Sequence, residues 1–282
     1  MQKFLYMLAP LEDTSDDALR TLCYRHGADT TFTEMASFES LARDNESTWE
    51  KLLIRNDTPA YVQIIGSKED MLKKFLNKYQ PPKAFLGFNL NLGCPNPAII
   101  SRGLGCAMVK RVSKTKKLVS IIQDYGYKCS IKMRLGLNRY EREKKVYCNL
   151  IDAIDAEFFV VHARDGSQLY GEPAEYSIYP ECVSFGKPII ANGDITSDQI
   201  DSLRRIGVKG AMIGKNAVYD PAIFGRMKGI DHTTYEDLRR EYEELSQQFP
   251  SRYKYKKNVL KRIGKMSSSD TEKAELSSLT MG

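Results

Sequence analysis

The feature that most constrains the fold of this 282-residue chain is a regular alternation of short apolar segments and amphipathic stretches. Eight segments have the apolar, aromatic and β-branched content typical of strands: residues 5–9, 30–35, 61–65, 85–91, 130–135, 158–162, 188–191 and 211–213. Helix-like stretches lie between them at residues 16–26, 36–55, 68–79, 114–125, 139–153 and 197–206. Most of the strands are almost continuously apolar, as parallel strands buried on both faces are. This alternation predicts an α/β fold, a (β/α)8 TIM barrel, with a doubly wound sheet as the alternative.

Residues with useful chemistry stand at or just beyond the end of nearly every predicted strand. They are Pro10, Glu34, Gln63, Asn91 with Cys94, Lys132 with Arg134, His162 with Arg164, Asn192 with Asp194, and Gly214 with Lys215. In a barrel these ends converge on one face, where barrel enzymes build their active sites. The pattern therefore predicts an enzyme whose site lies at the carboxyl ends of the strands.

The turns after the last two predicted strands contain Gly193-Asp194 and Gly214-Lys215. Glycine turns that open onto helices expose backbone N–H groups, and the loops after strands seven and eight of a barrel commonly bind phosphate. We therefore expect a phosphate-bearing cofactor. Neither the dinucleotide-binding glycine fingerprint nor a P-loop is present, so a Rossmann or P-loop nucleotide site is not indicated.

The charge distribution favours an anionic partner. The chain carries 42 Lys and Arg against 36 Asp and Glu, a formal net charge of +6. Residues 80–123 contain no acidic residue, and every charged residue in 252–265 is basic. The second block includes Lys254, Lys256 and Lys257 among tyrosines, a composition suited to a phosphate backbone, although solvated helix faces give the same pattern.

The six cysteines lack CxxC spacing, and only three histidines accompany them. A disulfide framework and a structural metal site are therefore not expected, and a reducing cytoplasm is the predicted compartment. No apolar run is long enough to cross a membrane, so we expect no membrane association.

Two neighbouring segments, NLGCPNP at residues 91–97 and RGLGCAM at residues 102–108, resemble the signature loop of the tRNA-dihydrouridine synthases. Further segments resemble that family in the same order: APL at 9–11, TEM at 33–35, VQIIG at 62–66, IKMRLG at 131–136, VHAR at 161–164, ANGDI at 191–195 and MIGKN at 212–216. The resemblance implies an FMN-containing barrel that uses NADPH to reduce the C5–C6 double bond of a flipped-out uridine in tRNA.

The resemblance also implies roles for individual residues. Cys94 is the implied general acid that protonates C5 of the uracil, and Lys132 is the implied cation beside the flavin. The implied cofactor-binding residues are Ala9, Pro10, Leu11, Gln63, Lys132, His162, Arg164, Asn192, Gly193, Asp194, Gly214 and Lys215. The implied substrate-binding residues are Asn91, Arg134, Lys254, Lys256 and Lys257.

The chain divides by pattern into three parts. Residues 1–230 are expected to form the catalytic barrel, 231–266 a short basic helical extension that binds RNA, and 267–282 a disordered tail. In the extension, Tyr235, Leu238, Tyr242, Leu245 and Phe249 recur at helical spacing and predict one apolar face. A flavoenzyme for free pyrimidines, of the dihydroorotate or dihydropyrimidine dehydrogenase type, and a tRNA-binding barrel without catalysis are the alternatives. A monomer is favoured.

Overall fold

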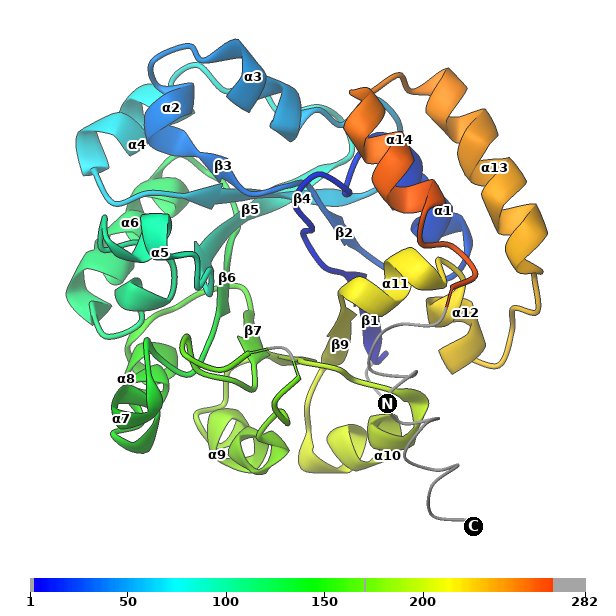
Figure 1. Ribbon diagram of the computed structural model, residues 1–282. Helices are drawn as coiled ribbons and strands as arrows, with labels where there is room; N and C mark the ends of the chain where they lie inside the picture. Colours follow the sequence, from blue (N-terminus) through cyan, green and yellow to red (C-terminus); the bar gives the residue numbers. More distant parts are fainter. Residues whose placement is uncertain (1–2, 170, 266–282) are drawn as a thin grey trace.

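The structure, a computed structural model, describes residues 3–169 and 171–265. Its strands form a ring that Figure 1 shows with helices on the outside. The strands are β1 (Leu5–Leu8), β2 (Thr31–Phe32), β3 (Ala36–Ser37), β4 (Ala60–Ile65), β5 (Phe85–Leu92), β6 (Cys129–Met133), β7 (Phe159–His162), β8 (Ile189–Asn192) and β9 (Gly210–Ile213). The sheet order is β1-β9-β8-β7-β6-β5-β4-β2, and β3 also pairs with β4.

The ring closes between β1 and the segment that leads into β2. All of the paired strands are parallel, and β1 pairs with β9 on one side. On the other side Met7 forms a parallel bridge with Thr30, and the Leu8 N–H donates to the Thr30 carbonyl at 2.9 Å. An open doubly wound sheet would leave its two edge strands apart. The predicted (β/α)8 barrel is therefore confirmed.

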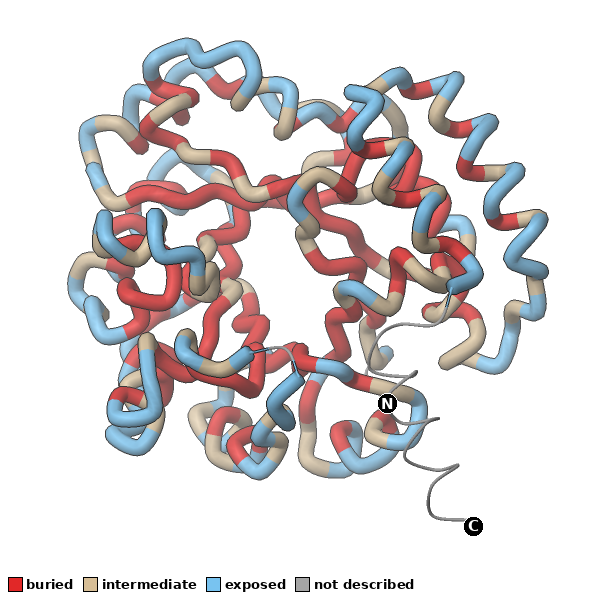
Figure 2. Tube along the Cα trace, in the orientation of Figure 1, coloured by how far each residue is buried: buried red, intermediate tan, exposed pale blue. Residues whose placement is uncertain are grey.

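The helices cover the outer face of the ring, where their apolar sides are buried against the strands (Figure 2). The α-helices are α1 (Asp17–Arg25), α2 (Phe38–Leu41), α3 (Glu46–Trp49), α4 (Glu69–Leu76), α5 (Pro97–Ile100), α6 (Val112–Asp124), α7 (Arg139–Glu143), α8 (Val146–Ala153), α9 (Tyr179–Ser184), α10 (Ser197–Ile206), α11 (Lys215–Tyr219), α12 (Ile223–Met227), α13 (Tyr235–Gln248) and α14 (Tyr253–Leu260). The 3₁₀-helices are η1 (Glu50–Leu52), η2 (Gly105–Met108) and η3 (Tyr176–Ile178).

Three predicted elements are interrupted in the structure. The predicted strand at 30–35 is only the two-residue β2, and β3 follows separately. The predicted helix at 36–55 is wrong as one element, because Asp44 has a left-handed φ of 60° and Asn45 caps a new helix, α3. The predicted helix at 139–153 is likewise broken, into α7 and α8, by Lys145 at φ 52°. Such residues stop a right-handed helix whatever the apolar spacing on either side.

The inside of the barrel is apolar at one end and polar at the other. A separate buried cluster fills the apolar end and extends to Ala9 and Met212 beside the polar end; its other members are Met7, Phe32, Tyr61, Phe158, Val160 and Ile190. Alternate residues of a strand face the same side. Two residues further along β4, β7 and β8 the same inner face therefore carries Gln63, His162 and Asn192. The fold thus directs a layer of polar side chains to the carboxyl ends of the strands.

The predicted apolar face of the extension packs into the main core. Leu238, Tyr242 and Leu245 on α13 are buried in the same cluster as the barrel helices, and α13 lies along α1 (Figure 1). The His26 ring, at the end of α1, bonds Asp231 at 2.6 Å and Glu241 at 2.9 Å. Part of the predicted extension, residue 266, and the whole predicted tail, 267–282, lie outside the described residues.

Candidate active site

A hollow opens at the polar end of the barrel and encloses about 600 Å³, its mouth included. It is lined by ten of the twelve predicted cofactor residues: Ala9, Pro10, Leu11, Lys132, His162, Asn192, Gly193, Asp194, Gly214 and Lys215. The rest of the lining belongs to two of the segments that carry the resemblance, but the sequence assigned these residues no individual role: Ile195, Met212, Ile213 and Asn216. The strand ends of β1, β6, β7, β8 and β9 therefore meet at one site, as a barrel requires.

Lys132 provides a cation at the floor of the hollow. Its Nζ donates to Asn192 Oδ1 at 2.9 Å, and Asn192 in turn donates to the Met212 carbonyl at 2.8 Å. Burial, helped by the neighbouring Arg134, lowers the pKa of Lys132 to about 8. An anion or a carbonyl oxygen in the hollow would favour the charged form and raise this pKa.

His162 is held neutral beside the same hollow. Burial, and the charges of Lys132, Arg134 and Arg164, move its pKa well below the usual value. Arg164 Nη1 lies 3.2 Å from His162 Nε2. Because a guanidinium can only donate, Nε2 accepts and the proton of the neutral ring sits on Nδ1.

The turn after β8 forms one side of the hollow, where its backbone lies near the side chains of Arg164 and Lys215. Gly193 and Asp194 both adopt positive φ, and a Cβ on Gly193 would lie 2.9 Å from the His162 ring. The buried Arg164 bonds the Asp194 carboxylate and donates through Nε to the Glu172 carbonyl at 2.7 Å. Lys215 stands across from this turn, at the start of α11. The arrangement suits an anionic group of phosphate size.

Two tyrosines that the sequence interpretation missed fasten this turn. The Tyr176 hydroxyl contacts the Gly193 carbonyl at 2.6 Å, and the Tyr179 hydroxyl contacts the Val161 carbonyl and the Asn192 backbone at 3.0 Å. Both come from the segment between β7 and β8, where no apolar periodicity marks a role. The one signal in the sequence for this role is the spacing of the two tyrosines, three residues or about one helical turn apart.

Cys94 lies on the loop after β5, in the position predicted for a reactive residue. Its backbone N–H and that of Gly93 both donate to Asn91 Oδ1 at 3.0 Å. The Cys94 carbonyl accepts the Cys106 N–H at 3.1 Å, and a Cβ on Gly105 would stand 2.3 Å from that carbonyl oxygen. Burial raises the pKa of the Cys94 thiol, although Lys132 and Arg134 oppose the shift, so the thiol is neutral at physiological pH.

The other five cysteines are buried. Cys106 is the nearest alternative to Cys94, but burial raises its pKa to about 11 and its side chain has no exposed surface. Among the described residues no group of His, Cys, Asp and Glu is arranged to hold a metal ion.

Two other predicted site residues, Gln63 and Arg134, are engaged with their neighbours. Gln63 is buried, with its amide bonded to Asn91 and Asn89 at 2.9 and 2.8 Å. The buried Arg134 donates to the carbonyls of Asp165 at 2.7 Å and Gln168 at 3.1 Å, which holds the loop after β7. Their predicted contacts with cofactor and substrate stay predictions; in the structure both side chains support the loops around the hollow.

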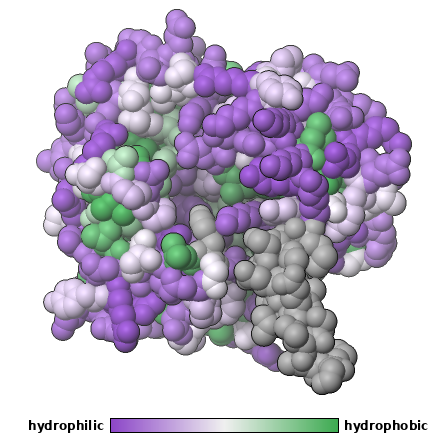
Figure 3. Space-filling model, in the orientation of Figure 1, coloured by the Kyte–Doolittle hydropathy of each residue, from purple (hydrophilic) through white to green (hydrophobic). Residues whose placement is uncertain are grey.

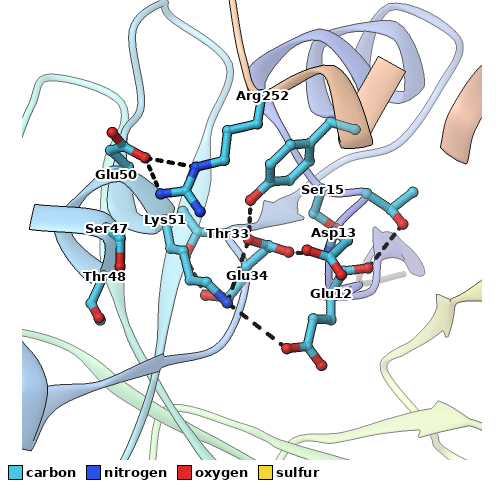
Figure 4. A network of polar contacts seen from close by, with 12 residues as sticks. Glu12, Asp13, Ser15, Thr33, Glu34, Ser47, Thr48, Glu50, Lys51 and Arg252 are labelled. Atoms are coloured by element: carbon cyan, nitrogen blue, oxygen red, sulfur yellow. Dashed lines mark hydrogen bonds and ion pairs between the residues drawn. The ribbon is translucent and has the colours of Figure 1, made fainter. Parts of the chain in front are cut away.

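Helix α14 docks beside the mouth through a polar network that Figure 4 shows in detail. The Tyr255 hydroxyl and the Asp13 N–H both donate to the carboxylate of Glu34, two residues beyond β2, and Lys51 Nζ lies 3.9 Å from that carboxylate. Burial raises the pKa of Glu34 despite these partners. A cleft of about 730 Å³ runs between α14 and the segment that includes η1.

The predicted substrate lysines lie on α14. Lys254 forms an ion pair with Asp13, Lys256 is half-buried and Lys257 is exposed. Figure 3 shows hydrophilic side chains over α14, whereas apolar side chains gather over α5 on another side of the mouth. The exposed Lys254 and Lys257 make the surface of α14 basic, whereas the surface over α5 is apolar.

A closed ring of parallel strands with its polar hollow at the carboxyl ends defines a barrel of the enzyme type. The sequence profile of the dihydrouridine synthase (Dus) family matches residues 7–278, and the chain belongs to this family. A Helicobacter pylori protein named "Probable tRNA-dihydrouridine synthase" is 32% identical over 238 residues, covering 80% of this chain and 70% of that protein. The tRNA-dihydrouridine synthase B of Pseudomonas putida is 28% identical over 233 residues, covering 80% of this chain and 67% of that protein.

Two further similarities extend the comparison. A human protein named tRNA-dihydrouridine(47) synthase-like, with NAD(P)(+) in its name, is 28% identical over 232 residues, which are 80% of this chain and 35% of that protein. Morphinone reductase superposes with a TM-score of 0.57 at 10% identity, covering 84% of this chain and 88% of that chain, a likeness of fold. None of the helices formed by residues 3–169 and 171–265 is long and apolar enough to cross a membrane.

Proposed function

We propose that the protein is an FMN-dependent tRNA-dihydrouridine synthase that uses NADPH to reduce the C5–C6 double bond of a uridine in tRNA. Membership of the Dus family and the names of its relatives support the reaction and the substrate. The observation that carries the proposal is that Cys94, whose thiol is neutral, and the Lys132 ammonium lie at the same end of a barrel whose hollow is lined by the Gly193–Asp194 turn and Lys215.

The residues that line the hollow fit FMN. The turn at Gly193 and Asp194, together with Lys215, would hold its phosphate, and Lys132 would lie beside the flavin ring. Lys215 carries charge without the bidentate fork of an arginine, and its pKa is lowered by burial and raised again by Asp194. A bound flavin supplies the hydride for C6 of the uracil.

The chain itself supplies the proton. A hydride added at C6 must be matched by a proton at C5, which requires an acid that is still protonated at working pH. The Cys94 thiol meets this requirement because burial holds its pKa above the ordinary value. Asn91 fixes the loop that presents the thiol, and Lys132 stabilises negative charge on the neighbouring ring system.

A stacked uridine cannot enter the hollow, so we infer that the target base is flipped out of the RNA. The exposed lysines of α14 and of the residues after it would contact phosphates on either side of the flipped nucleotide; they are Lys254, Lys257, Lys261 and Lys265. The name of the human relative supports a nicotinamide reductant, and six free cysteines fit a reducing compartment such as the cytoplasm.

The test is to purify the protein, record its flavin absorbance, and measure NADPH-dependent product formation with tRNA, orotate and uracil in parallel. We expect noncovalent FMN and dihydrouridine formed in tRNA only. Reduction of orotate or uracil in place of tRNA would assign a free-pyrimidine enzyme. Tight tRNA binding without any flavin, even after incubation with FMN, would assign a binding protein.

A further inference from the structure

A chain of side-chain hydrogen bonds runs across three strands beneath the Cys94 loop. Asn91 Nδ2 donates to Gln63 Oε1 at 2.9 Å, Gln63 Nε2 to Asn89 Oδ1 at 2.8 Å, and Asn89 Nδ2 to Ser130 Oγ at 2.9 Å. The Ser130 hydroxyl then donates to the Phe88 carbonyl at 3.4 Å. In the sheet Gln63 is the register partner of Asn89, and Asn89 that of Ser130, so the contacts follow directly from strand pairing.

Backbone groups at both ends determine the direction of this chain. The N–H groups of Gly93 and Cys94 can only donate, so the atom of Asn91 that faces them is its oxygen. The amide nitrogen of Asn91 then faces Gln63, which must present its oxygen. The amide nitrogen of Gln63 therefore faces Asn89, which must present its own oxygen. At the far end a carbonyl can only accept, which agrees with a serine hydroxyl that accepts from Asn89 and donates to Phe88.

The interior members are closed off from water. Asn89 and Ser130 have no exposed surface, and Gln63 is 1% exposed. Buried amides without partners are costly, and reversing Gln63 alone would set two donors against each other on its Asn91 side and two acceptors on its Asn89 side. The orientation of Asn89 is therefore linked to the side-chain oxygen that holds the backbone of Cys94.

We propose that Asn89 is a positioning residue: through Gln63 it fixes the amide orientation of Asn91 and thereby the placement of the Cys94 thiol. The inference rests on the proposed function only in treating Cys94 as the reacting group. Asn89 faces the barrel interior one layer below the site, so it acts on the thiol solely through the two amides above it.

The experiment compares two substitutions at this position, Asn89→Leu and Asn89→Asp, by the rate at which iodoacetamide alkylates Cys94 in the flavin-free protein. Leucine removes both the acceptor for Gln63 and the donor to Ser130. Aspartate can accept from both neighbours, so Gln63 and Asn91 keep their orientation. We expect Cys94 to react about fivefold faster in Asn89→Leu, the factor for a lost hydrogen bond of about 1 kcal/mol, and at close to the parental rate in Asn89→Asp.

The protein offers internal and external controls. The other five cysteines are buried, so their labelling reports global opening. Thr58→Val removes a buried hydroxyl contact with Thr21 (3.1 Å) at the opposite end of β4 and should leave Cys94 labelling unchanged. If Asn89→Leu does not fold, Ser130→Ala, which removes the acceptor for Asn89, is expected to accelerate labelling in the same direction.

Parental labelling of Cys94 in Asn89→Leu, or in Ser130→Ala if that variant replaces it, would overturn the proposal, as would equal acceleration in Asn89→Leu and Asn89→Asp. Because the assay needs neither flavin nor tRNA, its outcome is independent of whether the protein reduces uridine. In the assay of the proposed function, Asn89→Leu should lower uridine reduction while NADPH still reduces the flavin. Asn89→Asp should restore uridine reduction.

Discussion

Lys132 shows how burial and charge oppose each other at a single residue. With a pKa of about 8 against the ordinary 10.5, the folded protein holds the lysine proton less tightly than the unfolded chain does. As pH falls from 10.5 towards 8 the unfolded chain gains the proton first, so folding stability decreases, and below pH 8 the full cost is present. That cost is on the order of 2–3 kcal/mol, because the side chain is not fully shielded from water.

We therefore expect Lys132→Met to stabilise the flavin-free protein below pH 8. The expected net gain is about 1–2 kcal/mol, because the lost hydrogen bond to Asn192 offsets part of the burial cost that is removed. The advantage should shrink as pH approaches 10.5, the ordinary lysine value. Urea unfolding across this range measures it, with the exposed Lys209→Met as control. A Lys132→Met difference that does not change with pH would contradict the predicted burial cost.

Individual site residues could be predicted where a polar residue stands at the end of an apolar segment that predicts a strand. Lys132, His162 and Asn192 stand at or next to the ends of apolar segments, and the structure places all three around the hollow. What Gln63 and Arg134 bond was not predictable, because their partners, such as Asn89 and the Gln168 carbonyl, belong to other strands and loops. Spacing along one strand tells which face a side chain is on and leaves open which neighbour it meets there.

At the scale of elements, local conformation decided where the sequence interpretation was wrong. The apolar spacing across 36–55 suits a helix, but the left-handed Asp44 ends one helix and Asn45 starts another. Charge was similarly misleading within 80–123, where Lys83, Arg102, Lys110 and Lys117 pair with acids from distant segments: Asp57, Glu39, Glu141 and Glu69. A basic stretch in sequence is therefore much less basic in space.

The loop that carries Cys94 gives the prediction at this scale. Gly105 and Gly126 both have positive φ, 60° and 81°, but only at Gly105 would a Cβ collide with another segment, the Cys94 carbonyl at 2.3 Å. Gly126→Ala should cost about 1–2 kcal/mol, the strain of a left-handed alanine. Gly105→Ala should cost more, and should also displace the Cys94 loop and reduce uridine turnover at least about tenfold.

Thermal unfolding and turnover of the two glycine variants measure these effects. Gly126 has no atom within 4 Å of the added Cβ, so Gly126→Ala isolates the backbone strain. Equal losses of stability and unchanged turnover in both variants would show that the close approach at Gly105 has no part in holding the Cys94 loop.

At the scale of the whole molecule, the C-terminal helices are structurally part of the barrel. Val259 and Ile263, like the apolar face of α13, belong to the main core, and Tyr255 bonds a strand-end carboxylate. Removing residues 230–282 would expose these groups and destabilise the barrel. The proposed binding of RNA by α14 and the residues after it is better tested by changing their surface charge.

Lys257 and Lys261 suit this purpose, since both are exposed and neither forms an ion pair with the residues at 3–169 and 171–265. The double variant Lys257→Glu/Lys261→Glu should weaken tRNA binding about tenfold at physiological salt. The slope of log affinity against log salt should fall by about 2, one for each phosphate contact. Lys209→Glu, just before β9 at the other end of the barrel, is the control. Equal salt slopes in all three proteins would place the RNA elsewhere.

The central claim is that Cys94 supplies the proton and is needed for nothing earlier. The most direct measurement mixes the FMN-loaded, NADPH-reduced protein with unmodified tRNA in the absence of oxygen and follows flavin absorbance and dihydrouridine together. In Cys94→Ala we predict that NADPH reduces the flavin at the parental rate while tRNA reoxidises it at least about 100-fold more slowly. Cys106→Ala should retain the parental rate. Parental reoxidation in Cys94→Ala, with dihydrouridine formed, would contradict the account.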